Sequence, residues 1–228
     1  MQRLAKVIGC AGALVLAALF LATGCDNATG PSDGVSGESV TIDATVTFED
    51  VDQEGDIGEP DSLDGSVTVA GTEYDLETLF AELESVFEKF DALMDHNGEP
   101  PSEDIQAFED AIDALSNAEA AAFRLFFLIQ MSMGAMEDED FTSEELAEIG
   151  LVIDGDLEET GGTLEITFDG FPNFDGFDDD DGVAELFELV LGSGVSVDGT
   201  LTIAISFEDQ NGQTNMIMQV TGEVTFRQ

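Results

Sequence analysis

The densest group of carboxylates in the sequence lies directly before a predicted helix and has the chemistry to bind a hard cation. A helix–loop–helix Ca²⁺ site places oxygen ligands at the first, third, fifth and last positions of its loop, around a central glycine. With Gly182 as that glycine, Asp179, Asp181 and Glu188 take the third, fifth and last positions, but Phe177 falls on the first and cannot bind metal. The pattern therefore leaves two hypotheses open, a weak Ca²⁺ site and a solvated acidic loop beside a helix N-terminus.

Residues for nucleophilic, redox or zinc chemistry are scarce. His96 is the only histidine, and Cys10 and Cys25 are the only cysteines. Zinc and thiol chemistry thus lack ligands, and no nucleophile elbow, phosphate loop or dinucleotide motif occurs. The chain has no tryptophan and one tyrosine, Tyr74, so it is poorly supplied for stacking against sugars. We expect a protein that is not an enzyme and that carries no cofactor, with Ca²⁺ as the one possible exception.

The charge balance excludes whole classes of partner. The sequence has 51 acidic residues against 5 Lys and Arg, a net charge of −46. Nucleic acids and anionic lipid surfaces are bound through basic patches, so neither is expected as a direct partner. Repulsion between so many like charges opposes compaction unless salt screens it; the screening length is roughly 3 Å at 1 M salt. The composition resembles that of proteins from halophiles; the alternative is an acidic periplasmic protein stabilised by divalent cations.

The N-terminus carries a targeting signal. Residues 1–6 are short and basic, and residues 7–22 are almost wholly apolar, as in a secretory signal peptide. The following Leu-Ala-Thr-Gly-Cys resembles the bacterial lipobox, in which small residues precede a cysteine that is lipidated. The resemblance implies cleavage between Gly24 and Cys25 and acylation of Cys25. It covers only the first 25 residues.

Export and anchoring are what this resemblance implies. A bacterial lipid-modified cysteine carries at least two acyl chains, which are enough for stable membrane attachment. The protein is then exported and held by its lipid on the extracytoplasmic side of a membrane. The resemblance predicts neither the inner nor the outer membrane in particular. The mature chain has no cysteine left for a disulfide, so its core alone must stabilise it. The alternative is an N-terminal segment that stays uncleaved as the membrane anchor.

The sequence divides into three parts. Residues 1–24 are the predicted signal peptide; their removal takes the net charge from −46 to −48, because they carry two bases and no acid. Residues 25–39 are small, polar and glycine-rich, which is typical of a flexible tether. Residues 40–228 are predicted to form one acidic domain.

Hydrophobic periodicity predicts the fold of that domain. Apolar residues alternate over 40–48 and recur at 67 and 69, then switch to helical spacing from 76, and return to alternation near both ends of 151–226. The fold class is therefore α+β, with an antiparallel sheet built from N- and C-terminal strands and a central group of helices packed on one face. The nearly apolar run 120–133 predicts a buried helix, in which Arg124 needs an acidic partner.

Local signals add detail to this plan. Asp75 and Ser102 are predicted helix caps, and Ser116 and Thr142 begin capping boxes. A recurring apolar-Asp-Gly triplet is interpreted as a turn rather than a site; it occurs as Leu63-Asp64-Gly65, Ile153-Asp154-Gly155 and Val197-Asp198-Gly199.

The leading functional hypothesis is a lipid-anchored envelope protein that binds or supports other molecules without catalysis. One alternative is a carrier of hydrophobic cargo, with Phe and Met side chains lining a cavity of several hundred Å³. The commoner role of such side chains is to fill the core. They are Phe168, Phe171, Phe174 and Phe177, and Met131, Met133, Met136, Met216 and Met218. The second alternative is a Ca²⁺-dependent adhesion module. The ligand or protein partner itself is not predicted.

Overall fold

The computed structural model describes residues 37–48, 62–94, 101–137, 142–158, 161–173, 183–210 and 213–228. Several residues named above lie outside these ranges: Cys25 and Gly24 with the rest of 1–36, His96, Phe174, Phe177, Asp179 and Asp181.

Seven described strands form one antiparallel sheet in the order β3-β2-β1-β7-β6-β5-β4. They are β1 (Glu38–Phe48), β2 (Ser62–Val69), β3 (Thr72–Asp75), β4 (Leu151–Glu158), β5 (Gly161–Phe171), β6 (Ser196–Gln210) and β7 (Gln213–Arg227). β1 pairs with β7 along its whole length, from Glu38 opposite Phe226 to Phe48 opposite Met216. The sheet is thus built from N- and C-terminal strands, as the alternating patterns predicted, and the structure adds that they pair at its centre.

Each strand has one apolar and one polar face. In β1 the side chains of Val40, Ile42, Ala44, Val46 and Phe48 are at most 3% exposed, and the threonines and Asp43 between them point to the other face. The same alternation in β6 and β7 places Leu201, Ile203, Val220 and Val224 on the inner face. One face of the sheet is therefore the floor of the core.

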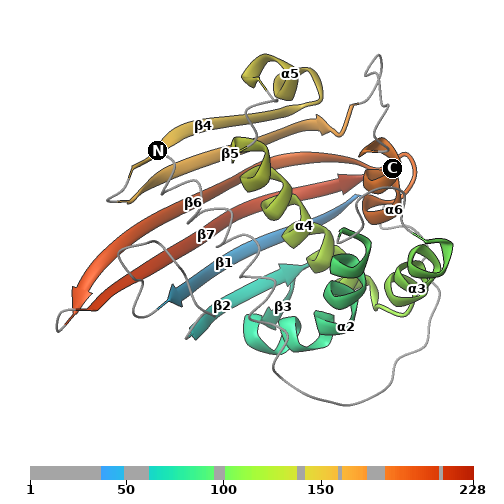
Figure 1. The fold of residues 1–228 in the computed structure, drawn as a ribbon, viewed down its shortest axis with the longest axis horizontal. Coiled ribbons are helices and arrows are strands. Elements are labelled where there is room, and N and C mark those ends of the chain that lie inside the picture. Colours follow the sequence, from blue (N-terminus) through green and yellow to red (C-terminus); the bar gives the residue numbers. More distant parts are fainter. Residues whose placement is uncertain are drawn as a thin grey trace.

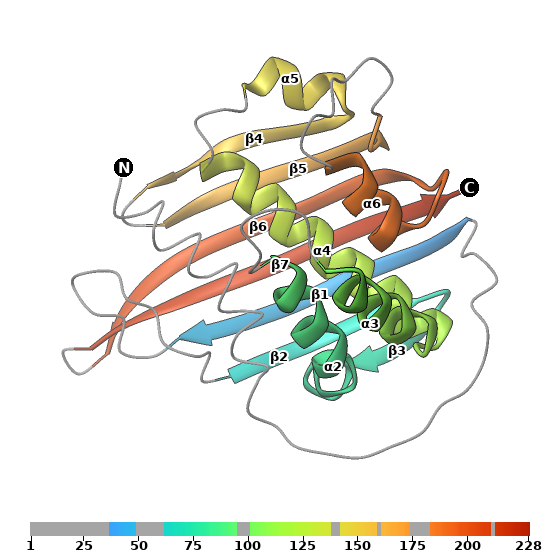
Figure 2. The same ribbon diagram turned by 45° about the vertical axis from the view of Figure 1, so that its right-hand side comes forward.

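All five described helices lie over this inner face or along its border (Figures 1 and 2). They are α2 (Leu76–Met94), α3 (Ser102–Asp113), α4 (Asn117–Glu137), α5 (Ser143–Glu148) and α6 (Val183–Leu191). α4 crosses the strands obliquely, and α5 lies beside the edge strand β4 (Figure 1). Every residue from Ala120 to Leu128 is buried, which confirms the predicted central helix. The structure is thus an α+β fold of two layers.

A cluster of phenylalanines joins the helices to one another. Phe87 and Phe90 of α2 contact Phe123 of α4, and Phe90 and Phe123 both contact Phe108 of α3. Their ring centroids are 5.3–6.3 Å apart and mostly tilted or edge-on, the geometry that aromatic pairs prefer. The core therefore consists of a helix–helix part rich in Phe and a sheet part rich in aliphatic residues.

Helix caps were predicted well, with one exception. The Asp75 carboxylate accepts hydrogen bonds from the backbone N–H and the hydroxyl of Thr78. The capping boxes at Ser116 and Thr142 are both formed. The prediction for Ser102 was wrong: Pro101 is the N-cap residue, no side chain caps α3, and Ser102 is its first helical residue.

The prediction that the Asp-Gly triplets form turns was wrong. All three lie inside strands, β2, β4 and β6. Their glycines have φ of 112° to 143°, a conformation that other residues rarely adopt. At Gly199 an added Cβ would lie 2.2 Å from the backbone oxygen of Glu223 on the neighbouring strand. The glycines therefore allow close approach of neighbouring strands within the sheet.

Two further differences concern strand limits. β1 begins at Glu38, inside the predicted tether, and β3 was not predicted because it is only four residues long and runs directly into α2. The Ala70-Gly71 turn that joins β2 to β3 has positive φ at both residues, as a tight hairpin requires.

Candidate functional site

An apolar pocket lies between the inner face of the sheet and helices α2 and α4. It is partly open to solvent, and Ile129 and Gln130 are its least buried lining residues. Its described lining residues are Ile42, Ala44 and Val46 of β1, Met218 and Val220 of β7, Leu76 and Phe80 of α2, and Phe126, Ile129, Gln130 and Met133 of α4. Because the segments come from both ends and the middle of the chain, no local sequence pattern could reveal the pocket.

A small side chain on the sheet makes room for the pocket. Ala44 stands in the middle of the floor, opposite Val220 of β7 on one side and Gly65 of β2 on the other. A larger residue at Ala44 would fill the space. Gly65 is exposed and does not line the pocket; a Cβ there would lie 2.2 Å from the backbone oxygen of Asp43, so its lack of a side chain serves the pairing of β1 with β2. The room above β1 therefore follows from the small side chain of Ala44.

The helical wall combines one rigid and one adaptable part. Phe80 and Phe126 are stacked with their ring centroids 4.3 Å apart, which fixes the position of α2 against α4 at the pocket. Met133 of α4 and Met218 of β7 contribute unbranched side chains, which adjust to a ligand more easily than branched ones. The methionines that the sequence suggested for an adaptable pocket thus include two that line it; Met216 is buried.

The described lining of the pocket provides no charge. None of its eleven described lining residues is charged, and Gln130, which is half-buried, is the only one with a polar side chain. In residues 37–228 the only bases are Lys89, Arg124 and Arg227, and none of them lines the pocket. A ligand in this pocket is therefore held by dispersion and the hydrophobic effect, without ion pairing to the lining.

The volume of the pocket limits what it holds in this conformation. It measures about 40 Å³. One water-sized group needs roughly 10–15 Å³ of such space, so the pocket takes about three groups of that size. This is far smaller than the cavity of several hundred Å³ that would enclose a whole lipid.

Arg124 is the one buried cation of the described core. It is 8% exposed, and its Nε donates to the backbone oxygen of Val190, 3.3 Å away, at the end of α6. This satisfies one of the carbonyls that a helix C-terminus leaves unpaired. Burial lowers the pKa of Arg124, and the charge of the nearby Glu38 carboxylate offsets part of this shift. Partial burial of Glu38 raises the pKa of its carboxyl group, and the charge of Arg124 offsets part of that shift.

Within the described ranges, the acidic partner predicted for Arg124 is Glu38, which acts on it only at longer range. Among the described residues no ion pair joins Arg124 to a carboxylate, and its buried Nη1 has no hydrogen-bond partner. We interpret Arg124 as a positioning residue that holds the end of α6 against α4.

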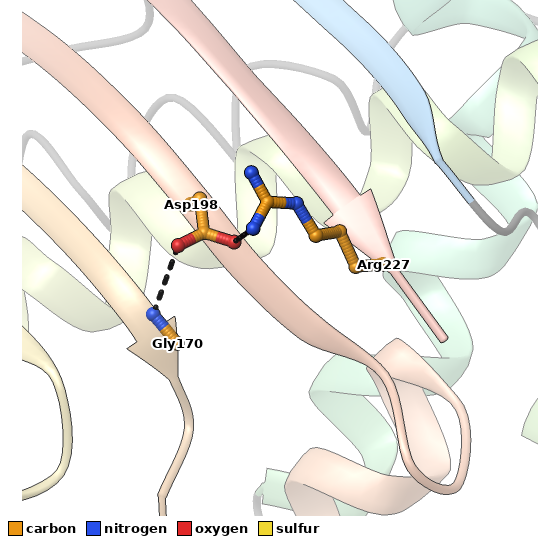
Figure 3. Close-up of polar contacts among 3 residues, drawn as sticks. All are labelled: Gly170, Asp198 and Arg227. Carbon is orange, nitrogen blue, oxygen red and sulfur yellow. Dashed lines mark hydrogen bonds and ion pairs between the residues drawn. The ribbon is translucent and has the colours of Figure 1, made fainter.

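Asp198, from one of the Asp-Gly triplets, has a structural role (Figure 3). Its Oδ1 accepts a hydrogen bond from the backbone N–H of Gly170, 3.2 Å away, where the register of β5 against β6 shifts. Its Oδ2 lies 2.9 Å from Nη1 of Arg227 on β7. Asp198 thus links three strands at an irregular point of the sheet, and the exposed pair with Arg227 adds little to stability.

The residues predicted to bind Ca²⁺ are described only in part. Glu188 is exposed on α6, while Asp179 and Asp181 lie outside the described residues. In the ranges that the structure describes, no three Asp, Glu, His or Cys side chains are grouped closely enough to bind a metal ion. Ca²⁺ binding at 179–188 stays a prediction.

Among the described helices, none combines the length and apolar character needed to cross a bilayer.

Comparisons with protein-family profiles, with curated proteins and with solved structures found no match for this chain.

Proposed function

We propose that this protein is a lipid-anchored protein of the bacterial cell envelope whose single domain binds other molecules through an apolar pocket, without catalysis. The anchor half of the proposal rests on Cys25 and the lipobox-like residues before it. The binding half rests on one structural observation, the open and uncharged pocket between the sheet and α4.

Several features of the domain support a binding role. Its largest side chains pack tightly, and many Phe and Leu side chains are less than 2% exposed, so the space beside Ala44 and Met133 stands out from a dense surrounding core. Small-ligand sites are typically concave and mostly apolar with a few polar groups, and this pocket has a lining of that kind on a smaller scale. A solvent-open pocket of this kind costs hydrophobic contacts that a closer packing would gain, which favours a functional reason for it.

The anchor is tested by labelling the native host with an alkyne analogue of palmitate and recovering the protein. We expect label on the wild-type protein and a mass that corresponds to cleavage before Cys25 with added acyl chains. The variant Cys25→Ser should lose the label and stay full length, because no other thiol can replace it as the lipidated residue.

Cys10→Ser is the matched control, since Cys10 lies inside the segment that should be removed. It should leave both the label and the mass of the mature protein unchanged. Full-length, unlabelled wild-type protein in the soluble fraction would contradict the anchor, and with it the proposed location.

A further inference from the structure

We infer that the pocket takes the end of an unbranched alkyl chain belonging to an amphiphile whose head group is uncharged or cationic. The inference rests on the proposed binding function and goes beyond it by naming the chemistry of the ligand. It follows from the shape of the pocket, from the charge around it and from the place of Gln130.

Shape selects a slim ligand. The pocket is about 40 Å³, and its floor consists of β1 from Ile42 to Val46 and the facing Met218 and Val220 of β7. A planar ring system or a branched terpene does not fit in this space, whereas the last few methylenes of a straight chain do. Met133 and Met218 can change rotamer and lengthen the channel by small steps as more of the chain enters.

Charge selects the head group. The protein carries −46, so its field repels anions from every approach, and no lining residue offers a compensating base. A fatty acid or anionic phospholipid would bring its negative charge to the mouth of an uncharged pocket on a strongly acidic molecule. An alcohol, ester, sugar or quaternary ammonium group avoids this cost, and a cationic one is attracted.

Gln130 marks where that head group lies. It is half-buried and carries the only polar side chain among the described lining residues. An amide donates and accepts hydrogen bonds without charge, so it pairs with hydroxyl and ester groups equally well. The alkyl chain then extends from Gln130 towards Ala44 and the stacked pair of Phe80 and Phe126.

The test compares three ligands with the same ten-carbon chain, 1-decanol, decyltrimethylammonium and decanoate, by isothermal titration calorimetry. The full chain is made by cell-free synthesis without membranes, so that export and acylation of Cys25 play no part. We expect decanol and decyltrimethylammonium to bind with a Kd of about 100 µM, as expected for a ligand of this size. Decanoate should bind about tenfold more weakly at low salt, and this difference should shrink as salt screens the charges.

Two substitutions of equal size separate the pocket from other surfaces. Ala44→Leu fills the floor and should weaken decanol binding at least tenfold. Ala204→Leu places the same side chain on β6, where Ala204 faces the opposite side of the sheet between Thr163 and Gln219, and should leave binding unchanged. Circular dichroism and the Tm establish that both variants are folded.

A third variant reverses the charge preference. Gln130→Lys puts a cation at the mouth and should raise the affinity for decanoate about tenfold while lowering that for decyltrimethylammonium. The measurement on Gln130→Lys remains informative even if the Ala44→Leu variant does not fold. Equal binding of all three ligands to wild type and Gln130→Lys, undiminished binding to Ala44→Leu, or no binding at all would each overturn the inference. None of these results bears on Cys25, whose acylation is measured separately.

Discussion

At the scale of single residues, Gly199 shows how closely this sheet depends on glycine. It stands near the start of β6 with φ of 143°, and a Cβ there would lie 2.2 Å from the Glu223 oxygen. We expect Gly199→Ala to reduce the free energy of unfolding by about 3 kcal/mol or more, because both the backbone conformation and the interstrand contact are lost.

Gly194 is the matched control for this prediction, since it has φ of 71° but nothing within 4 Å of an added Cβ. Gly194→Ala should cost about 1 kcal/mol, from backbone conformation alone. Urea unfolding at constant salt measures both. Equal losses for the two variants would show that the strand contact at Gly199 is unimportant.

At the scale of elements, the junction of α2 with α4 brings two carboxylates together. Packing of the helices removes part of the water around Glu82, and the charge of Glu119 and a hydrogen bond to it act in the same direction, so the pKa of Glu82 is raised. A group whose pKa is raised on folding contributes its full stabilisation below its unfolded pKa. This contribution is lost as the pH rises through the folded pKa. The ionised pair therefore weakens the junction at neutral pH.

Glu82→Gln should raise the Tm near pH 7 by about 1–2 °C, a small effect because solvent screens an exposed pair. The gain should vanish near pH 3.5, below the ordinary pKa of a glutamate, because the raised pKa of Glu82 keeps that side chain protonated there. Glu88→Gln, also exposed on α2, controls for the loss of one negative charge. Melting curves that show the same gain for both variants would assign the effect to net charge and not to the Glu82–Glu119 pair.

Also at this scale, periodicity predicted most of the elements and the sheet with helices on one face, but not the detailed contacts between them. The alternation in β1 and the buried run of α4 are dictated by burial on one face or all round, so both were predicted correctly. The in-strand glycines were mistaken for turns, because a positive φ serves a turn and a close strand contact equally well. The place of the pocket could not be predicted, although Met133 and Met218 were among the side chains suggested for one: they meet Ala44 and Phe80 only through the pairing of β1 with β7 and the oblique path of α4.

At the scale of the whole molecule, the dominant property is charge. With −46 in 228 residues, self-repulsion should lower stability in dilute buffer and relax as salt shortens its range. We expect the Tm to rise by about 10 °C or more between 0.1 M and 2 M NaCl, followed by circular dichroism.

CaCl₂ and MgCl₂ at matched ionic strength distinguish screening from specific binding. Equal Tm values in the three salts are the expected result if screening alone acts. A higher Tm in CaCl₂ than in MgCl₂ would instead establish the Ca²⁺ site predicted from the sequence, provided that the double variant Asp179→Asn, Asp181→Asn abolishes the difference. A Tm that is independent of NaCl would refute the assignment of the acidic composition to a saline environment.

The pairing of β1 with β7 also has a consequence for biosynthesis. The strand that emerges first from the ribosome must wait for the last one, residues 213–227, before it gains its second neighbour at the middle of the sheet. A nascent chain can therefore not complete its central ladder before β7 has been synthesised. For the export proposed above, such a delay would leave the polypeptide unfolded at its centre while its earlier part enters a translocation channel.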